Sequence, residues 1–169
     1  MNRHAAGWIR KLKLKPHPEG GWYAETYRSA DRWPADALPA RYRGARAAST
    51  AIYYLQEGRG ISALHRLASD ELWFFHAGAT LRLDLIGPRG QARVVRLGAR
   101  RGRGDCRPQA VLPAGWWFGA RLERGRGFAL VSCTVAPGFD FADFEAARRA
   151  DLLARHPSHA AVIRALTGA

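Results

Sequence analysis

The sequence predicts a single all-β domain over residues 1–169, a double-sheet jelly-roll barrel with short helices at its two ends. Short segments rich in β-forming residues recur between Gly and Pro turns, which is typical of a sandwich or barrel. Apolar and polar residues alternate over 81–85, as they do in a half-buried strand. Helical patterns occur only near the two ends, and the length suits one domain with a core.

The elements are expected in the following order. A helix over about 2–13 is broken by the prolines and glycines of 16–21. We expect strands at 22–28, 49–55, 72–76, 81–85, 92–97, 109–112, 116–121 and 128–135, with an exposed loop at 31–46 and a basic, glycine-rich loop at 98–108. Asp140 and Ser158 are the expected N-caps of two C-terminal helices separated by Pro157.

Composition narrows the class of protein. Hydrophobic residues make up 47% of the chain, so it is globular. It carries 27 Lys and Arg against 14 Asp and Glu, a formal charge of +13, which raises the question of nucleic-acid binding. The basic stretch 93–107 contains no aromatic residue on which bases could stack, so we do not expect nucleic acid as a partner.

The sequence also predicts the compartment. We find no apolar run long enough to cross a bilayer and no N-terminal signal sequence. Cys106 and Cys133 form no CxxC pair and are expected to be free thiols. A cytoplasmic protein with no membrane partner is therefore expected.

A spaced motif begins at His65. Glu71 follows six positions later, and Gly78 comes after a strand-length gap. This frame resembles the first motif of the cupin superfamily, in which two alternating histidines and a glutamate hold a metal. Leu67 stands at the position of the second histidine, and Phe118 stands at the histidine position of the second motif, which begins at Pro113.

Half of the expected metal ligands are therefore missing. Since two ligands rarely hold a transition metal, no cofactor is expected. Rescue by His17, Glu25 or His76 remains an alternative, in which the chain is a metal-dependent enzyme using His65 and Glu71.

Most of the chain resembles one cupin family, known as cupin 5. The matching segments are residues 14–29, 50–55, 65–66, 70–73, 113–115 and 135–140. The family is described as similar to sugar epimerases, and its reaction is unsettled. The resemblance implies a jelly-roll barrel and a homodimer.

Alternation along the strands predicts a pocket. If Glu71 faces inward, Trp73 also does, and His65 shares a face with Leu67. The expected polar cluster is His65, Glu71, Glu25, Tyr27 and Gln109. The full set of expected ligand-binding residues is His17, Glu25, Arg28, Arg66, Trp73, Gln109 and Trp117. Each has a structural alternative, such as packing for the tryptophans and an ion pair for Glu71.

These residues suggest proton transfer. A metal-independent epimerase or isomerase of a sugar or sugar nucleotide would use His65 as base, with Glu71 or Glu25 orienting it. Tyr27 would return the proton on the other face. The basic surface would attract a small polar or anionic ligand. A non-enzymatic module that holds a small ligand in the same pocket is the alternative.

Overall fold

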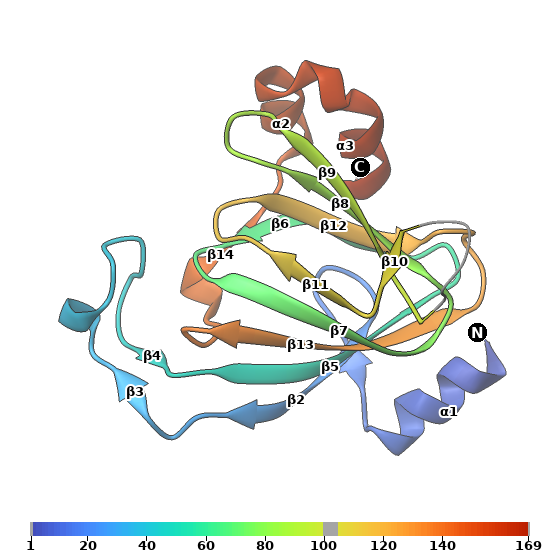
Figure 1. The fold of residues 1–169 in the computed structure, drawn as a ribbon, viewed down its shortest axis with the longest axis horizontal. Coiled ribbons are helices and arrows are strands. Elements are labelled where there is room, and N and C mark those ends of the chain that lie inside the picture. Colours follow the sequence, from blue (N-terminus) through green and yellow to red (C-terminus); the bar gives the residue numbers. More distant parts are fainter. Residues whose placement is uncertain (1, 100–104, 169) are drawn as a thin grey trace.

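The computed structural model describes residues 2–99 and 105–168 and shows two six-stranded sheets facing each other (Figure 1). The first sheet has the order β1–β2–β5–β13–β7–β11, with bounds Lys15–Pro16, Trp22–Arg28, Thr50–Glu57, Phe128–Ala136, Asp70–Gly78 and Gln109–Leu112. The second has the order β10–β9–β8–β12–β6–β14, with bounds Cys106–Arg107, Ala92–Leu97, Leu81–Ile86, Trp117–Leu122, Ile61–Leu67 and Phe144–Ala146. The all-β jelly-roll prediction is confirmed.

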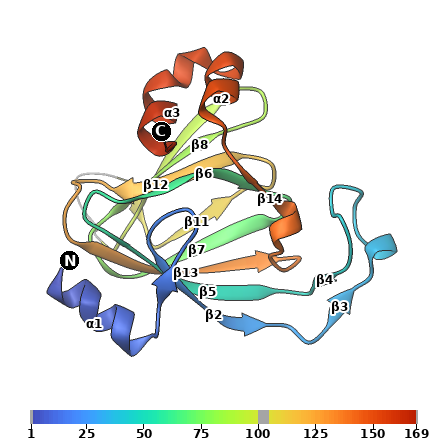
Figure 2. The same ribbon diagram turned by 180° about the vertical axis from the view of Figure 1, so that it is seen from behind.

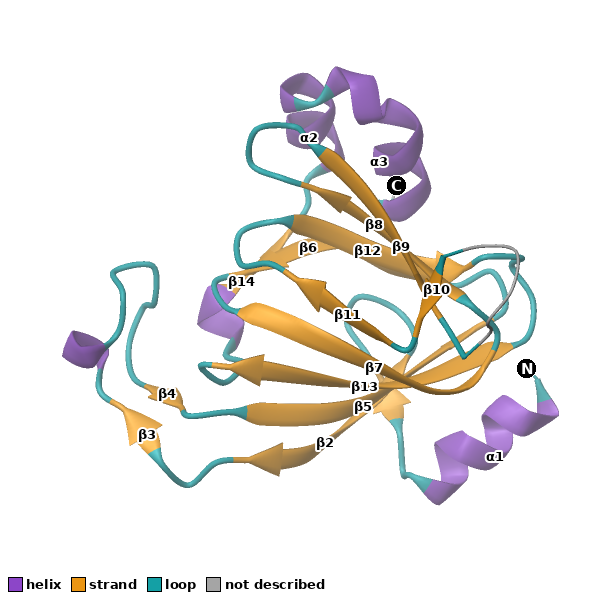
Figure 3. Ribbon diagram, in the orientation of Figure 1, coloured by secondary structure: helices purple, strands orange, loops and turns teal. Residues whose placement is uncertain are grey.

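The core lies between the sheets. Leu81, Leu83 and Leu85 on β8 are buried, as their alternation predicts. They pack in one cluster with Phe118 of the neighbouring strand β12 and with Val131 of β13 in the facing sheet. Strands dominate the centre of the molecule and helices lie at its periphery (Figure 3).

Helices cover the outer faces of the barrel at opposite ends (Figure 1 and Figure 2). α1 (Arg3–Lys11) packs on β5 and β13, and the Asn2 side chain caps it by accepting from two backbone N–H groups. α2 (Arg149–Arg155) and α3 (Ala160–Leu166) pack on the second sheet. The described part of the chain contains no helix of the length and apolarity needed to cross a membrane.

Several expected elements differ. The segment expected as a loop at 31–46 contains a short strand, β3 (Arg32–Trp33), which pairs with β4 (Arg46–Ala47). A 3₁₀ turn at Ala35–Ala37 lies between the two strands. Asp140 caps only a 3₁₀ turn, because its side chain accepts from the Ala142 N–H and the chain then enters β14. The two C-terminal helices are instead α2 and α3, and Ser158 lies inside a 3₁₀ turn between them.

The predicted basic loop at 98–108 is only partly described. Residues 100–104 lie outside the described residues, and β10 occupies two of the remaining positions. β10 pairs in parallel with β9, so this end of the loop continues the second sheet.

Candidate functional site

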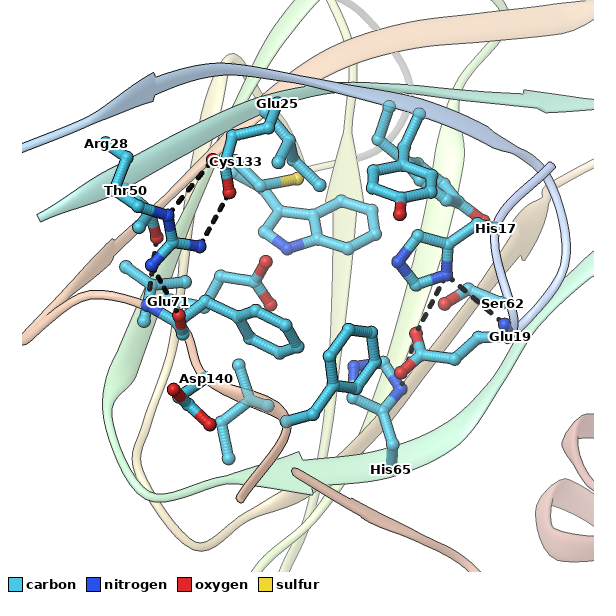
Figure 4. A pocket seen from close by; sticks show the side chains of 18 of the residues that line it. His17, Glu19, Glu25, Arg28, Thr50, Ser62, His65, Glu71, Cys133 and Asp140 are labelled. Atoms are coloured by element: carbon cyan, nitrogen blue, oxygen red, sulfur yellow. Dashed lines mark hydrogen bonds and ion pairs between the residues drawn. The ribbon is translucent and has the colours of Figure 1, made fainter. Parts of the chain in front are cut away.

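A cavity of about 420 Å³ opens between the two sheets. Its lining includes six of the residues expected from the sequence: His17, Glu25, Arg28, His65, Glu71 and Trp73. Further lining residues are Lys15, Glu19, Tyr23, Thr50, Ile52, Tyr54, Ser62, Leu67, Cys133, Val135, Phe139, Asp140 and Phe141. Figure 4 shows Glu25, Arg28 and Thr50 on one side, and His17, Glu19 and Ser62 on the other.

The loop between β1 and β2 brings Glu19 into the cavity. The Glu19 carbonyl accepts from the Ala63 N–H at 3.0 Å, which ties the loop to β6. The Tyr54 hydroxyl donates to the Gly20 carbonyl at 2.9 Å. Gly20 has a φ of +101°, and a Cβ there would lie 2.2 Å from the Ile61 carbonyl oxygen. Only glycine allows this close approach, so the loop sequence fixes where Glu19 points.

His65 is held at two points. Its Nδ1 lies 2.7 Å from the Ala63 carbonyl oxygen and 3.1 Å from Glu19 Oε2. Since a carbonyl oxygen only accepts, Nδ1 carries the proton and Nε2 is bare in the neutral ring. His17 accepts from the Glu19 backbone N–H through its own Nδ1 at 3.2 Å. The two histidines therefore bracket Glu19.

Burial determines the protonation states of His17, Glu19 and His65. It lowers the pKa of His65 to about 4 and the pKa of His17 to about 4. Burial, helped by the negative charge of Glu71, raises the pKa of Glu19 to about 9. Both imidazoles are therefore neutral near pH 7, and Glu19 retains its proton.

Glu71 lies on β7 with 7% of its surface exposed. Burial raises its pKa to about 7. Trp73 Nε1 is buried without a hydrogen-bond partner among the described residues, and its N–H beside Glu71 lowers the pKa of that carboxyl group, against the larger effect of burial. The sequence suggested Glu71 or Glu25 as the group that orients His65; among the described residues, the carboxyl group beside His65 Nδ1 is that of Glu19.

A β-bulge in β2 decides which residues face the cavity. Glu25 pairs with Ile52 and Tyr27 with Ala51, so the register shifts between them. The extra residue reverses the alternation. Tyr27 is consequently 54% exposed and outside the cavity, and its expected inward position is wrong. The same shift turns Arg28 inward.

The prediction that Gln109 lines the cavity is also wrong. It is exposed on β11 and pairs directly with Phe74 of β7. Directly opposite residues share a face, and Phe74 alternates with the inward-facing Trp73. Gln109 therefore lies on the outer surface of the sheet.

Arg66 and Trp117 lie outside the cavity as well, although the sequence suggested that both bind ligand. The Arg66 guanidinium stacks 4.6 Å above the Trp117 ring and pairs with Glu145 at 2.6 Å. Trp117 packs beneath α2 and α3. Because Arg66 follows the inward-facing His65 on a strand, its side chain must point to the other face.

The cavity does not fit the metal site that the cupin motifs imply. Leu67 lines the wall without a ligating atom, and the Phe118 ring centre lies 4.1 Å from that of His65. Over residues 2–99 and 105–168, no three His, Cys, Asp or Glu side chains gather as they would around a metal ion. The chemistry considered below therefore uses side chains alone.

Several lining residues escaped the sequence analysis, and Glu19 is the most consequential. The available signal was its place beside His17, between Pro18 and Gly20, in the segment that resembles the cupin 5 family. Period-two alternation along β13 could have identified Cys133, which shares a face with Val135.

Comparisons with known proteins agree with this architecture. A family model described as "Cupin superfamily (DUF985)" matches residues 6–147. A crystal structure from Shewanella oneidensis is 37% identical with a TM-score of 0.86, covering 99% of this chain and 98% of that one. A hypothetical protein from Leishmania major is 39% identical with a TM-score of 0.85, covering 98% and 99%.

More distant similarity concerns the fold alone. The oxalate decarboxylase of Lactobacillus farciminis, in a formate complex, is 10% identical with a TM-score of 0.55, covering 95% of this chain and 43% of that one. No curated protein matches the sequence. The family match and the two full-length relatives together show that the chain belongs to the cupin superfamily, in the DUF985 or cupin 5 family.

Proposed function

We propose that the cavity binds a sugar-sized polar molecule and transfers protons at a carbon beside a carbonyl group, as an epimerase or isomerase does. One observation carries this proposal. Glu71 is buried and the Glu19 side chain is 10% exposed; both carboxyl groups face the same cavity, and no Lys or Arg side chain of the described residues pairs with either. Carboxyl groups that differ in pKa within one cavity can serve as acid and base.

The cavity size supports a small ligand. About 420 Å³ lies toward the lower end of the range for small-molecule sites. Aromatic side chains such as Trp73 and Tyr23 form part of the wall, and a few polar groups converge on the interior. This is the usual composition of a site that orients a small polar molecule.

The pKa values support a different role for each carboxyl group. Burial raises the pKa of Glu71 to about 7, so a large fraction is ionised near neutral pH and can accept a proton from carbon. Burial raises the pKa of Glu19 to about 9, so this group keeps a proton to donate to the carbonyl oxygen. His65, neutral because burial lowers its pKa to about 4, acts as a positioning residue for Glu19.

The step balances without a co-reactant. Glu71 breaks a C–H bond and takes the proton, the electron pair moves into the carbon skeleton, and Glu19 protonates the carbonyl oxygen to give an enediol. Reversal with delivery of the proton to another carbon, or to the other face, completes isomerisation or epimerisation and restores both carboxyl groups.

Solvent exchange tests this proposal without knowledge of the product. The protein is incubated in D₂O with a panel of aldoses, ketoses and 4-keto sugars, and deuterium incorporation beside the carbonyl is followed by NMR. We expect incorporation with at least one sugar, its loss in Glu71→Gln, and its retention in Tyr27→Phe, since Tyr27 lies outside the cavity. Binding of a sugar without any exchange would contradict turnover and favour the non-enzymatic binding module.

A further inference from the structure

The charges that line the cavity contrast with those of the whole chain. Lys and Arg outnumber Asp and Glu by 27 to 14 overall. In the cavity, four acidic side chains stand against two basic ones, counted over the described residues. These are Glu19, Glu25, Glu71 and Asp140 against Lys15 and Arg28. A chain rich in basic residues therefore encloses a cavity in which carboxyl groups outnumber basic groups, with Glu19 protonated near pH 7. Surface charges farther away than about 8 Å are largely screened at physiological salt.

Of these two basic side chains, Arg28 is the one whose donors are engaged by other protein groups. The Arg28 guanidinium donates to Glu25 from Nε at 3.0 Å and from Nη2 at 2.7 Å, and its Nη1 donates to the Phe139 carbonyl at 3.2 Å. All three nitrogen atoms are thus engaged. Lys15 is exposed, with its Nζ 5.1 Å above the centre of the Tyr23 ring.

The bulge in β2 makes this arrangement possible. In a regular strand, residues three apart point to opposite faces. The register shift after Glu25 brings Glu25 and Arg28 to the same face, where the carboxylate meets the guanidinium in a two-bonded fork. A bidentate fork of this kind is also the geometry by which Arg binds a phosphate or a carboxylate of a ligand.

We propose that Glu25 is a specificity-determining residue that occupies the Arg28 fork, so that the cavity accepts uncharged polar ligands and rejects phosphorylated ones. A phosphate that reached Arg28 would have to displace Glu25, which would then remain as an unpaired carboxylate beside it. Asp140, close enough to affect the pKa of Arg28, adds a second negative charge. The substrate class under the proposed function is then an unmodified sugar, not a sugar phosphate or a sugar nucleotide.

The test replaces Glu25 and asks whether the cavity gains affinity for phosphate. Inorganic phosphate is titrated into the wild type and Glu25→Gln, with the Arg28 Nε–H and Trp73 Nε1–H signals followed by NMR. We expect shifts at Arg28 in Glu25→Gln with at least tenfold higher affinity than in the wild type. Glu25→Ser serves as a second variant, because both residues of the pair are partly exposed and either change should leave the fold intact.

Glu145→Gln is the matched control. Glu145 accepts from Nε and Nη2 of Arg66 through one oxygen, Oε2, outside the cavity, so this change removes the same charge and frees an Arg side chain there. We expect no shift at Trp73 or Arg28 in this control. Phosphate binding at Arg28 in the wild type that is as tight as in Glu25→Gln, or no binding in either Glu25 variant, would overturn the inference.

The inference rests on the proposed function, yet the two fail differently. The phosphate titration requires no turnover, so its result stands even if the D₂O exchange experiment finds no reaction. Conversely, exchange on a sugar phosphate that equals exchange on the parent sugar would overturn the charge preference and leave proton transfer in place.

Discussion

Nδ1 of His65 lies 3.1 Å from Oε2 of Glu19, across the junction between β6 and the loop that precedes β2. A second contact, with the Ala63 carbonyl oxygen, fixes the plane of the imidazole. The ring is neutral and buried, and under the proposed function it holds the Glu19 carboxyl group in one orientation toward the cavity.

Replacing His65 tests that positioning role. We expect His65→Asn to fold and to lower the exchange rate of a responsive sugar by about 10–100-fold, since misplacing an acid by about 1 Å has an effect of this size. KM should change much less than kcat. The pH profile should separate positioning from mere packing, because the alkaline limb set by Glu19 should move. A rate and profile equal to the wild type would contradict the assignment.

The buried carboxyl groups predict a loss of stability at alkaline pH. The pKa of Glu19 is raised from 4.5 to about 9 and the pKa of Glu71 from 4.5 to about 7. Between pH 4.5 and the folded pKa of each group, the folded protein keeps a proton that the unfolded chain has released. The free energy of unfolding therefore falls as the pH rises through this range. The slope is about 1.4 kcal/mol per pH unit for each proton of difference.

His17 and His65, whose pKa values are lowered from 6.5 to about 4, make stability rise with pH, but only below about pH 6.5. Between pH 6.5 and 9 the carboxyl groups alone remain among these four. We expect urea unfolding to show falling stability over that window, and a flatter dependence in Glu19→Gln and Glu71→Gln. A wild-type stability that rises with pH from 6.5 to 9 would contradict the prediction.

Gly20 is expected to be essential for the loop that carries Glu19. In Gly20→Ala the new Cβ would meet the Ile61 carbonyl oxygen at 2.2 Å, which forces the loop away from β6. Gly58→Ala is the control, because Gly58 also has a positive φ, +59°, but no atom within 4 Å of the added Cβ. We expect a lower melting temperature and weaker sugar binding in Gly20→Ala, and about 1–2 kcal/mol of destabilisation with normal binding in the control. Equal effects would show that contact with Ile61 is unimportant.

The ion pair of Arg46 with Asp143 anchors the segment that ends the cavity wall. Both side chains are buried, with 4% and 5% exposed. Arg46→Ala leaves a buried carboxylate without its partner, so we expect destabilisation of about 3–5 kcal/mol in urea unfolding. Asp105→Asn breaks the exposed pair with Arg107 and should change stability by less than about 1 kcal/mol. Comparable losses in the two variants would contradict this reading.

A homodimer is the expected assembly. β11 is the edge strand of the first sheet, and Val111 on it is 40% exposed. An open edge with exposed apolar side chains favours pairing with a second copy. We expect light scattering at micromolar concentration to give twice the mass of one chain, and Val111→Lys to shift the protein toward the monomer. A strict monomer in the wild type would contradict the prediction.

The alternation of side chains within each strand could be predicted from the sequence, and with it the barrel. Period-two patterns fix which residues share a face, so His65, Glu71 and Trp73 were correctly expected in the cavity. The same argument failed for Tyr27, since a bulge adds one residue and inverts every face beyond it. The prediction that Gln109 faces the cavity was wrong because the pairing register between β11 and β7 could not be read from the sequence.

The grouping of Glu19 with His65, on which the proposed acid–base chemistry rests, depended on the tertiary structure. Glu19 reaches His65 only because hydrogen bonds to β6 and Tyr54 bring the loop back over the barrel. The charge states follow from burial, which raises the pKa of Glu19 and lowers the pKa of His65. Local sequence determines strand periodicity because that depends on neighbouring residues. Loop crossings, bulges and burial depend on contacts between distant segments, so only the folded chain decides them.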